Sequence, residues 1–127
     1  QTYTANETNG VFHIHQAVQP KMSDCLINGF NWKGYYLAYA TNGTISACGA
    51  KSGSSGQAAH YVTYGTGTSV LGCSHSGGFG FKCTNAEDVL VDGYLSLNSS
   101  NAGLYAYCSK NVVFANSTVK QPATKGA

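Results

Sequence analysis

An internal repeat constrains the fold of this chain more than any other feature. Five segments each open with an alternating aromatic or aliphatic stretch and close with a second short apolar stretch, most clearly at residues 79–83 with 89–93. Aligning the second stretches gives a column of apolar residues: Leu26, Ile45, Val70, Leu90 and Val113. Subtraction gives spacings of 19, 25, 20 and 23 residues. Units this short bury their apolar side by stacking on their neighbours.

The residues between the two stretches indicate strands joined by turns. Residues 41–43 (Thr-Asn-Gly) and 65–67 (Gly-Thr-Gly) are typical turn sequences. The pattern predicts an all-β fold, a right-handed parallel β-helix (solenoid) of about five coils, with like strands stacked about 4.8 Å apart. A β-sandwich is the alternative, because it also has short strands at regular spacing. The length fits one domain, and we expect a lead-in at 1–10, coils at 11–120, and a tail or further coil at 121–127.

One segment also resembles a known family. Residues 103–119, Gly-Leu-Tyr-Ala-Tyr-Cys-Ser-Lys-Asn-Val-Val-Phe-Ala-Asn-Ser-Thr-Val, look like a coil of the pectate-lyase-like superfamily. Its members include polysaccharide lyases, glycoside hydrolases and phage tailspikes. The resemblance extends over residues 11–119 and concerns architecture, because no catalytic motif accompanies it. It implies a tailspike-like recognition element on a virion surface or in an extracellular setting, assembled as a homo-oligomer, either a trimer or an end-to-end stack.

Strand alternation predicts which side chains face the core, because successive residues point to opposite faces. We expect an inward set: Val89, Val91, Gly93, Leu104, Ala106, Cys108, Val112, Phe114 and Asn116. We expect an outward set: His13, His15, Tyr35, Leu37, Tyr39, Lys82, Gly103, Tyr105 and Tyr107. The column from Leu26 to Val113 would lie outside on another face, which is a liability for a monomer. Either its register is shifted by one residue, or another chain covers it.

The outward aromatic residues are the candidates for carbohydrate binding. The predicted set is His13, His15, Tyr35, Tyr39, Tyr105 and Tyr107. Rings on a rigid sheet stack against sugar faces while their hydroxyl groups bond to sugar hydroxyls. This wide, weakly charged contact suits a neutral glycan, so we expect a polysaccharide partner. The alternative is that tyrosines occur here because they favour strands.

Acidic residues are too few to favour catalysis by this chain alone. Glu87, Asp88 and Asp92 are the candidate catalytic residues because they lie in one coil. Hydrolysis needs two carboxylates about 5 to 9.5 Å apart, whereas Asp88 and Asp92 would lie about 13 Å apart on an extended strand at 3.3 Å per residue. A polysaccharide lyase or glycoside hydrolase is therefore the alternative function. A third is a purely structural fibre or decoration protein built from stacked coils.

Other classes of partner are disfavoured. The chain has no arginine and its lysines are scattered, so it lacks the guanidinium groups typical of nucleic-acid readers. It has no apolar stretch near the roughly 20 residues that a membrane span needs. His13 and His15 project to one side of a strand but have no evident third ligand. We expect no metal, no cofactor, no nucleic acid and no membrane insertion.

The five cysteines carry information about stacking. Cys48 and Cys73 are 25 residues apart, as are Cys83 and Cys108. Each pair is expected to stack in neighbouring coils, at a separation that a disulfide tolerates. Either two disulfides or a ladder of free buried thiols would result, and the ladder is favoured because Cys25 would have no partner.

Overall fold

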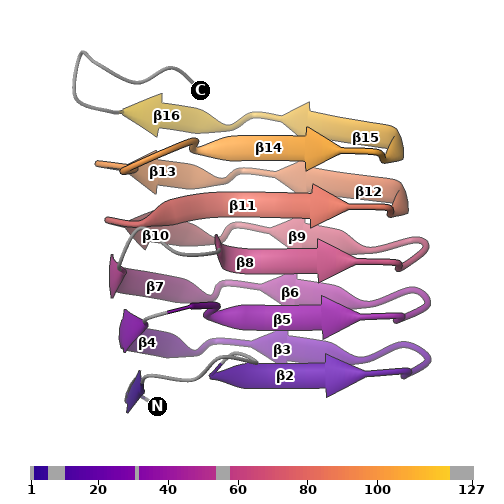
Figure 1. Cartoon of the computed structure of the whole chain (residues 1–127), viewed down its shortest axis with the longest axis horizontal. Coiled ribbons are helices and arrows are strands. Elements are labelled where there is room, and N and C mark those ends of the chain that lie inside the picture. Colours follow the sequence, from indigo (N-terminus) through magenta and orange to yellow (C-terminus); the bar gives the residue numbers. More distant parts are fainter. Residues whose placement is uncertain (1, 6–10, 31, 54–57, 121–127) are drawn as a thin grey trace.

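The chain winds through stacked coils, each built from three short strands (Figure 1). The computed structural model describes residues 2–5, 11–30, 32–53 and 58–120. Every strand pair in this part of the chain is parallel, and the strands belong to three sheets. This arrangement confirms the predicted parallel β-helix, with three strands per coil rather than two.

Each sheet takes one strand from every coil. The aromatic sheet consists of β2 (Phe12–His15), β5 (Tyr35–Ala38), β8 (Ala58–Thr63), β11 (Phe79–Thr84) and β14 (Leu104–Tyr107). The second sheet consists of β3 (Lys21–Ser23), β6 (Thr44–Ser46), β9 (Ser69–Leu71), β12 (Glu87–Asp92) and β15 (Lys110–Ala115). The third sheet consists of β1 (Thr2–Ala5), β4 (Leu26–Phe30), β7 (Gly49–Gly53), β10 (Ser74–Ser76), β13 (Leu95–Leu97) and β16 (Thr118–Lys120).

The chain bends at residues with left-handed backbone conformation. After each strand of the aromatic sheet comes one residue with φ between +48° and +55°: Gln16, Tyr39, Tyr64, Asn85 and Cys108. A second such position lies between the second and third sheets: Asp24, Ala47, Gly72, Gly93 and Asn116. A non-glycine residue in this conformation is disfavoured by about 1–2 kcal/mol. Its recurrence in every coil indicates that the winding requires it.

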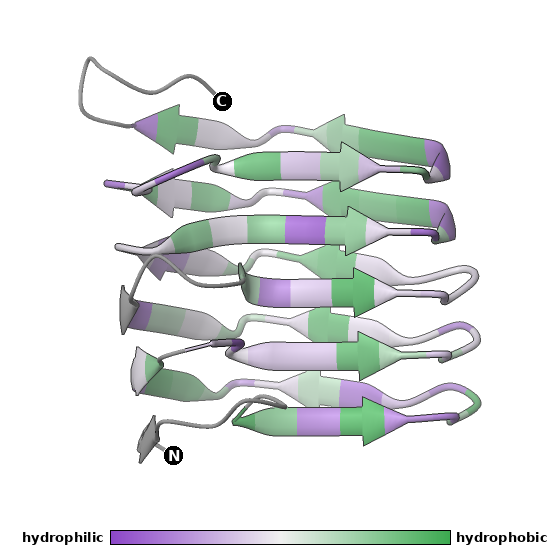
Figure 2. Cartoon of the chain, in the orientation of Figure 1, coloured by the Kyte–Doolittle hydropathy of each residue, from purple (hydrophilic) through white to green (hydrophobic). Residues whose placement is uncertain are grey.

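The core consists of inward columns that run along the axis of the solenoid. The second sheet contributes one continuous column: Met22, Ile45, Val70, Val91 and Phe114. The aromatic sheet contributes another: Phe12, Tyr35, His60, Phe81 and Leu104. Figure 2 shows the alternation that produces this burial, with hydrophobic and hydrophilic residues taking turns along β2. Burial of these columns is the main driving force for folding.

The predicted apolar column is wrong at two points. Leu26 lies in β4 of the third sheet, beside Gly49, and not in the second sheet. Val70 stacks on Val91 rather than on Leu90. Because a shift of one residue exchanges the faces of a strand, Ile45 and Val70 are fully buried. Exposed Leu90 and Val113 do lie side by side, but they are not part of one exposed column with Ile45, which is buried.

Tyr35 and Leu37 correct the predicted outward set. Both are 0% exposed and face the core, and Tyr36 faces outward between them. Counting alternation back from outward Tyr39 places Leu37 and Tyr35 on the outward face, whereas Tyr39 is a left-handed bend residue (φ +55°) after β5, where alternation stops. Gly103 is likewise buried. The hydroxyl of Tyr35 lies within hydrogen-bond distance of the backbone oxygens of Cys25 (2.9 Å) and Gly49 (2.7 Å), and its one hydrogen is satisfied by donating to either of them inside the fold.

The predicted inward positions Gly93, Asn116 and Cys108 are also wrong, because all three are exposed bend residues. Strand alternation stops at a left-handed residue, so counting through the bend assigns the wrong face. Ala106 is in the inward register beside buried Cys83, although it is exposed in the last described coil.

The cysteines form one ladder of three rather than two pairs. Cys25, Cys48 and Cys73 each precede an equivalent residue of the third sheet, so they stack in successive coils. All five cysteines are free thiols, which confirms the favoured ladder for Cys48 and Cys73. The prediction that Cys25 has no partner is wrong. Cys108 is level with Asn85 and does not stack on Cys83.

Candidate functional site

A row of outward side chains crosses the aromatic sheet along the axis of the solenoid. This outer row consists of His13, Tyr36, Tyr61, Lys82 and Tyr105, which are paired in register. The rings of His13 and Tyr36 stack with centroids 4.5 Å apart, and those of Tyr36 and Tyr61 with centroids 5.2 Å apart. The parallel register thus holds ring faces at regular intervals on a rigid surface.

Tyrosines at the first bend continue this surface toward the second sheet. Tyr39 and Tyr64 stack with centroids 5.0 Å apart and ring planes 7° apart. Both are about half exposed, at 49% and 53%. The ring of His15 lies 5.2 Å from that of Tyr39, which joins the two groups of rings.

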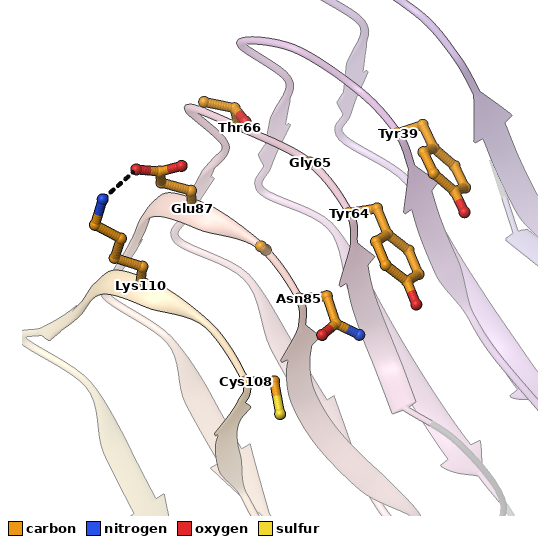
Figure 3. A pocket seen from close by; sticks show the side chains of 9 residues that line it. Tyr39, Tyr64, Gly65, Thr66, Asn85, Glu87, Cys108 and Lys110 are labelled. Carbon is orange, nitrogen blue, oxygen red and sulfur yellow. Dashed lines mark ion pairs between the residues drawn. The ribbon is translucent and has the colours of Figure 1, made fainter.

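A corner pocket of about 470 Å³ lies beside these tyrosines (Figure 3). Buried Gly65 and Ala86 contribute to its lining. Its other lining residues come from two rows along the bend: Tyr39, Tyr64, Asn85 and Cys108 from one, and Thr66, Glu87 and Lys110 from the other. Aromatic faces with a few polar groups around a concave surface are typical of sites for small polar ligands.

The three candidate catalytic carboxylates do not meet in this pocket. Glu87 lines it and pairs with Lys110 at 3.0 Å, and the hydrogen bond to Glu87 raises the pKa of Lys110. Asp88 accepts a hydrogen bond from Asn111 at 3.0 Å, and Asp92 accepts one from Asn116 at 3.0 Å. Glu87 is the one carboxylate among the described residues of the pocket lining. The pocket therefore offers contacts for binding but not the carboxylate pair of a glycoside hydrolase.

His13 and His15 project from β2 to the same side, with ring centroids 5.9 Å apart. The pKa of His13 is lowered, mainly because burial disfavours the charged form and also because His15 and Lys33 lie nearby. Within the described ranges, no three histidine, cysteine, aspartate or glutamate side chains are grouped so that they could hold a metal ion.

The structure brings most predicted carbohydrate-binding residues to one surface. His13, His15, Tyr39, Tyr105 and Tyr107 are exposed on the aromatic sheet or its bend, whereas Tyr35 is not. Sequence reasoning missed further residues of this surface: Lys33, Tyr36, Tyr61, Tyr64 and Lys110. Aligning residues 59–64 with 80–85 would have found Tyr61, because it places Tyr61 beside Lys82, which was predicted to face outward.

A family model described as "Right handed beta helix region" matches residues 9–127. The chain matches no curated protein and no solved structure. No helix in the described ranges is long and apolar enough to cross a membrane.

Proposed function

The chain belongs to the right-handed β-helix family, and on this basis we propose that its aromatic sheet recognises a polysaccharide. The family fold supports a structural or carbohydrate-related role. The outer row carries the more specific proposal, because it presents stacked ring faces from successive coils in one register. An extended glycan lying along the axis would meet one side chain of this row per coil. Such contacts combine ring stacking with hydrogen bonds from tyrosine hydroxyls.

The corner pocket supplies a second set of contacts. Its hydroxyl, amide and charged groups include Thr66, Asn85 and Lys110, beside the faces of Tyr39 and Tyr64. A branch or terminal sugar of a polymer held on the outer row would have hydrogen-bond partners here. The pocket would then help to decide which glycan binds.

We extend the proposal to the setting of the protein, a tailspike-like homo-oligomer on a virion surface or outside the cell. The resemblance of residues 103–119 to tailspike coils supports this setting. Leu90 and Val113 support an oligomer, because they lie side by side on the second sheet and are 37% and 53% exposed. A second subunit would remove these apolar side chains from water.

Catalysis is the second candidate function, and the carboxylates support it less well than the ring faces support binding. A lyase or hydrolase would use Glu87 beside the pocket tyrosines, but this carboxylate pairs with Lys110. Asp88 and Asp92 accept hydrogen bonds from different residues of the next coil. A purely structural protein of stacked coils would not require the aromatic surface at all.

Removing two rings of the outer row tests the proposal. We expect Tyr36→Ala with Tyr61→Ala to weaken polysaccharide binding about five- to 150-fold, because each of the two ring contacts contributes about 0.5–1.5 kcal/mol. The measurement is binding of the purified chain to an array of bacterial and plant polysaccharides, followed by titration of the best ligand. Tyr36→Phe with Tyr61→Phe should keep most of the affinity, since the ring faces remain.

The matched control is Thr44→Ala with Ser69→Ala, which removes outward side chains at two neighbouring coils of the second sheet. This variant should bind as the unchanged protein does. Failure to bind any polysaccharide on the array, or equal affinity of the two-alanine tyrosine variant and the unchanged protein, would contradict the proposal.

A further inference from the structure

Three thiols stack at the bend between the second and third sheets. Cys25, Cys48 and Cys73 come directly before equivalent residues of β4, β7 and β10, which pair in register. Each sulfur lies within hydrogen-bond distance of the backbone oxygen two residues earlier, at 3.2, 3.3 and 3.6 Å. The three side chains therefore have the same orientation, and their sulfurs follow one another along the axis. We call these three residues the thiol ladder.

The coils hold neighbouring members of the thiol ladder at a distance that a disulfide can bridge. The Gly49 nitrogen donates to the Cys25 oxygen at 2.9 Å, and the Ser74 nitrogen donates to the Cys48 oxygen at 3.1 Å. Stacked positions in a parallel sheet lie about 4.8 Å apart, within the range of roughly 4.4–6.8 Å that the α-carbons of a disulfide span. Parallel side chains keep their β-carbons about as far apart, slightly farther than a disulfide prefers, so such a bond would be strained and readily reduced.

One member of the thiol ladder is accessible and the next is not. Cys48 and Cys73 are each 1% exposed, whereas Cys25 is partly exposed. Cys25 also lines a pocket of about 360 Å³ beside β2 and β3, to which Ile14 and Met22 contribute. An accessible thiol beside a second thiol is typical of a redox site, because the first reacts with the oxidant and the second displaces it.

The middle sulfur of the thiol ladder ionises most easily. The pKa of Cys48 is lowered and that of Cys73 is raised, first because the Cys73 thiol donates its hydrogen to the Cys48 sulfur when that sulfur is ionised. The pKa of Cys25 is raised, first by burial and then by the charge of Cys48. A thiolate is the form that attacks a disulfide, so Cys48 is suited to attack a sulfur held on Cys25.

We propose that Cys25 and Cys48 form a redox site that takes small disulfides, such as oxidised glutathione, and closes a bond between neighbouring coils. The Cys25 thiolate attacks one sulfur of the small disulfide, which leaves a mixed disulfide on Cys25 and releases one glutathione thiolate. The Cys48 thiolate then attacks the Cys25 sulfur and displaces the second glutathione. The two protons of the cysteines end on the two glutathione thiolates, so the protein dithiol is oxidised and one small disulfide is reduced. The free thiols of the structure are the reduced form of this site.

The bond would fasten one coil of the outer row. Residues 25–48 include β5, which carries Tyr36, and the bond closes them into a loop. Because a disulfide restrains the unfolded chain, the oxidised protein should melt about 5 °C higher than the reduced protein. Excess reduced glutathione should reverse this shift. Disulfides persist in an extracellular or virion-surface setting, and the inference does not depend on polysaccharide binding.

Peptide mapping tests the proposal, because each member of the thiol ladder lies in a different tryptic peptide. Cleavage after lysine gives peptides 22–33, 34–51 and 52–82, which contain Cys25, Cys48 and Cys73 in that order. The full chain with Cys108→Ser, which removes an exposed thiol, is incubated with oxidised glutathione while folded and is then unfolded in N-ethylmaleimide. We expect peptide 22–33 linked to peptide 34–51 with the loss of two hydrogens, and N-ethylmaleimide on Cys73.

Alanine variants locate the site. Cys25→Ala should abolish both the cross-link and the melting shift. The matched control Cys83→Ala, at a buried cysteine outside the thiol ladder, should change neither. A lasting mixed disulfide on Cys25 without the cross-link, a bond between peptides 34–51 and 52–82 alone, or no reaction with oxidised glutathione would each overturn the inference. Loss of the cross-link in Cys83→Ala would overturn it as well.

Discussion

Lowering the pH from 7.5 to 4 is expected to reduce the free energy of unfolding by about 3 kcal/mol through one buried side chain, His60. This histidine is 0% exposed, and its pKa is lowered to about 3, mainly because burial disfavours the imidazolium and also because His75 lies nearby. The unfolded chain takes up a proton near pH 6.5, whereas the folded chain does so only near pH 3. The stability is therefore complete above pH 6.5 and is lost progressively as the pH falls toward 3.

Hydrogen bonds define the neutral form that the fold requires. His60 Nε2 donates to the backbone oxygen of Cys48 at 3.1 Å, so Nδ1 is free of hydrogen and accepts from the hydroxyl of Tyr94 at 2.7 Å. His75 donates from Nδ1 to the oxygen of Gly77 at 3.0 Å and accepts at Nε2 from Ser96 at 2.7 Å. The pKa of His75 is lowered by burial as well, which adds to the loss of stability in acid.

The variant His60→Phe with Tyr94→Phe tests this account. It removes both partners of one buried hydrogen bond, and the oxygen of Cys48 keeps its bond from the backbone nitrogen of Ser74. Urea unfolding at pH 7.5 and 4 should show that the variant loses at least about 2 kcal/mol less than the unchanged protein. His15→Phe, at an exposed histidine, should leave the loss as large as before. An equal loss in the double variant and the unchanged protein would refute the role of His60.

Replacing Gly80 by alanine is expected to destabilise the fold by about 3 kcal/mol, the second large effect. A β-carbon at this buried position would overlap the backbone oxygen of Gly103 and lie 2.8 Å from His75 Nε2. The Gly103 oxygen cannot retreat easily, because it accepts from the Phe81 nitrogen while the Gly80 nitrogen donates to the Ala102 oxygen, and His75 Nε2 is held by its hydrogen bond with Ser96. The added methyl group must therefore separate two coils. Thermal and urea unfolding measure the effect.

Gly72→Ala is the control, since nothing lies within 4 Å of an added β-carbon there. Its φ of +60° is disfavoured for alanine, which limits the expected loss to about 1–2 kcal/mol. Greater stability of the Gly80 variant than of the Gly72 variant would show that the coils do not stack as closely as described.

The repeat alone predicts the parallel winding, because the period of about 20 to 25 residues leaves few folds that bury every segment. The sequence also predicts the stacking of Cys48 on Cys73, since that pair is separated by one full coil. Coil length varies by a few residues, however, and a single residue exchanges the two faces of a strand. For this reason the sequence alignment pairs Leu90 with Val70, whereas in the structure Val91 is the residue that pairs with Val70.

The candidate site was predicted only in part, because the same one-residue shift exchanges inward and outward side chains. His13, Tyr39 and Tyr105 were assigned to the correct face, while Tyr35 was exchanged with Tyr36. In the pair Tyr35 and Tyr36, residue type does not reveal which ring is buried. The left-handed bend at Tyr39 decides it, because strand alternation stops there, and the sequence does not locate that bend without the third strand of each coil. The approach of Lys33 to the Tyr61 ring depends on how the chain runs from the third sheet to the aromatic sheet, and no local sequence pattern indicates it.

The stacked coils place the outward rings in one row, to which we propose that a polysaccharide binds. Aromatic nuclear Overhauser spectra of tyrosine- and histidine-labelled protein, recorded with and without the polysaccharide of the array that binds best, test this arrangement. We predict cross-peaks between Tyr36 and Tyr61 and between Tyr35 and His60, whose ring centroids lie 5.2 and 4.8 Å apart. The polymer should broaden the signals of Tyr36 and Tyr61 and leave those of buried Tyr35 and Tyr94 unchanged. Cross-peaks between Tyr35 and Tyr61, or broadening that spares Tyr36 and Tyr61, would contradict the claim.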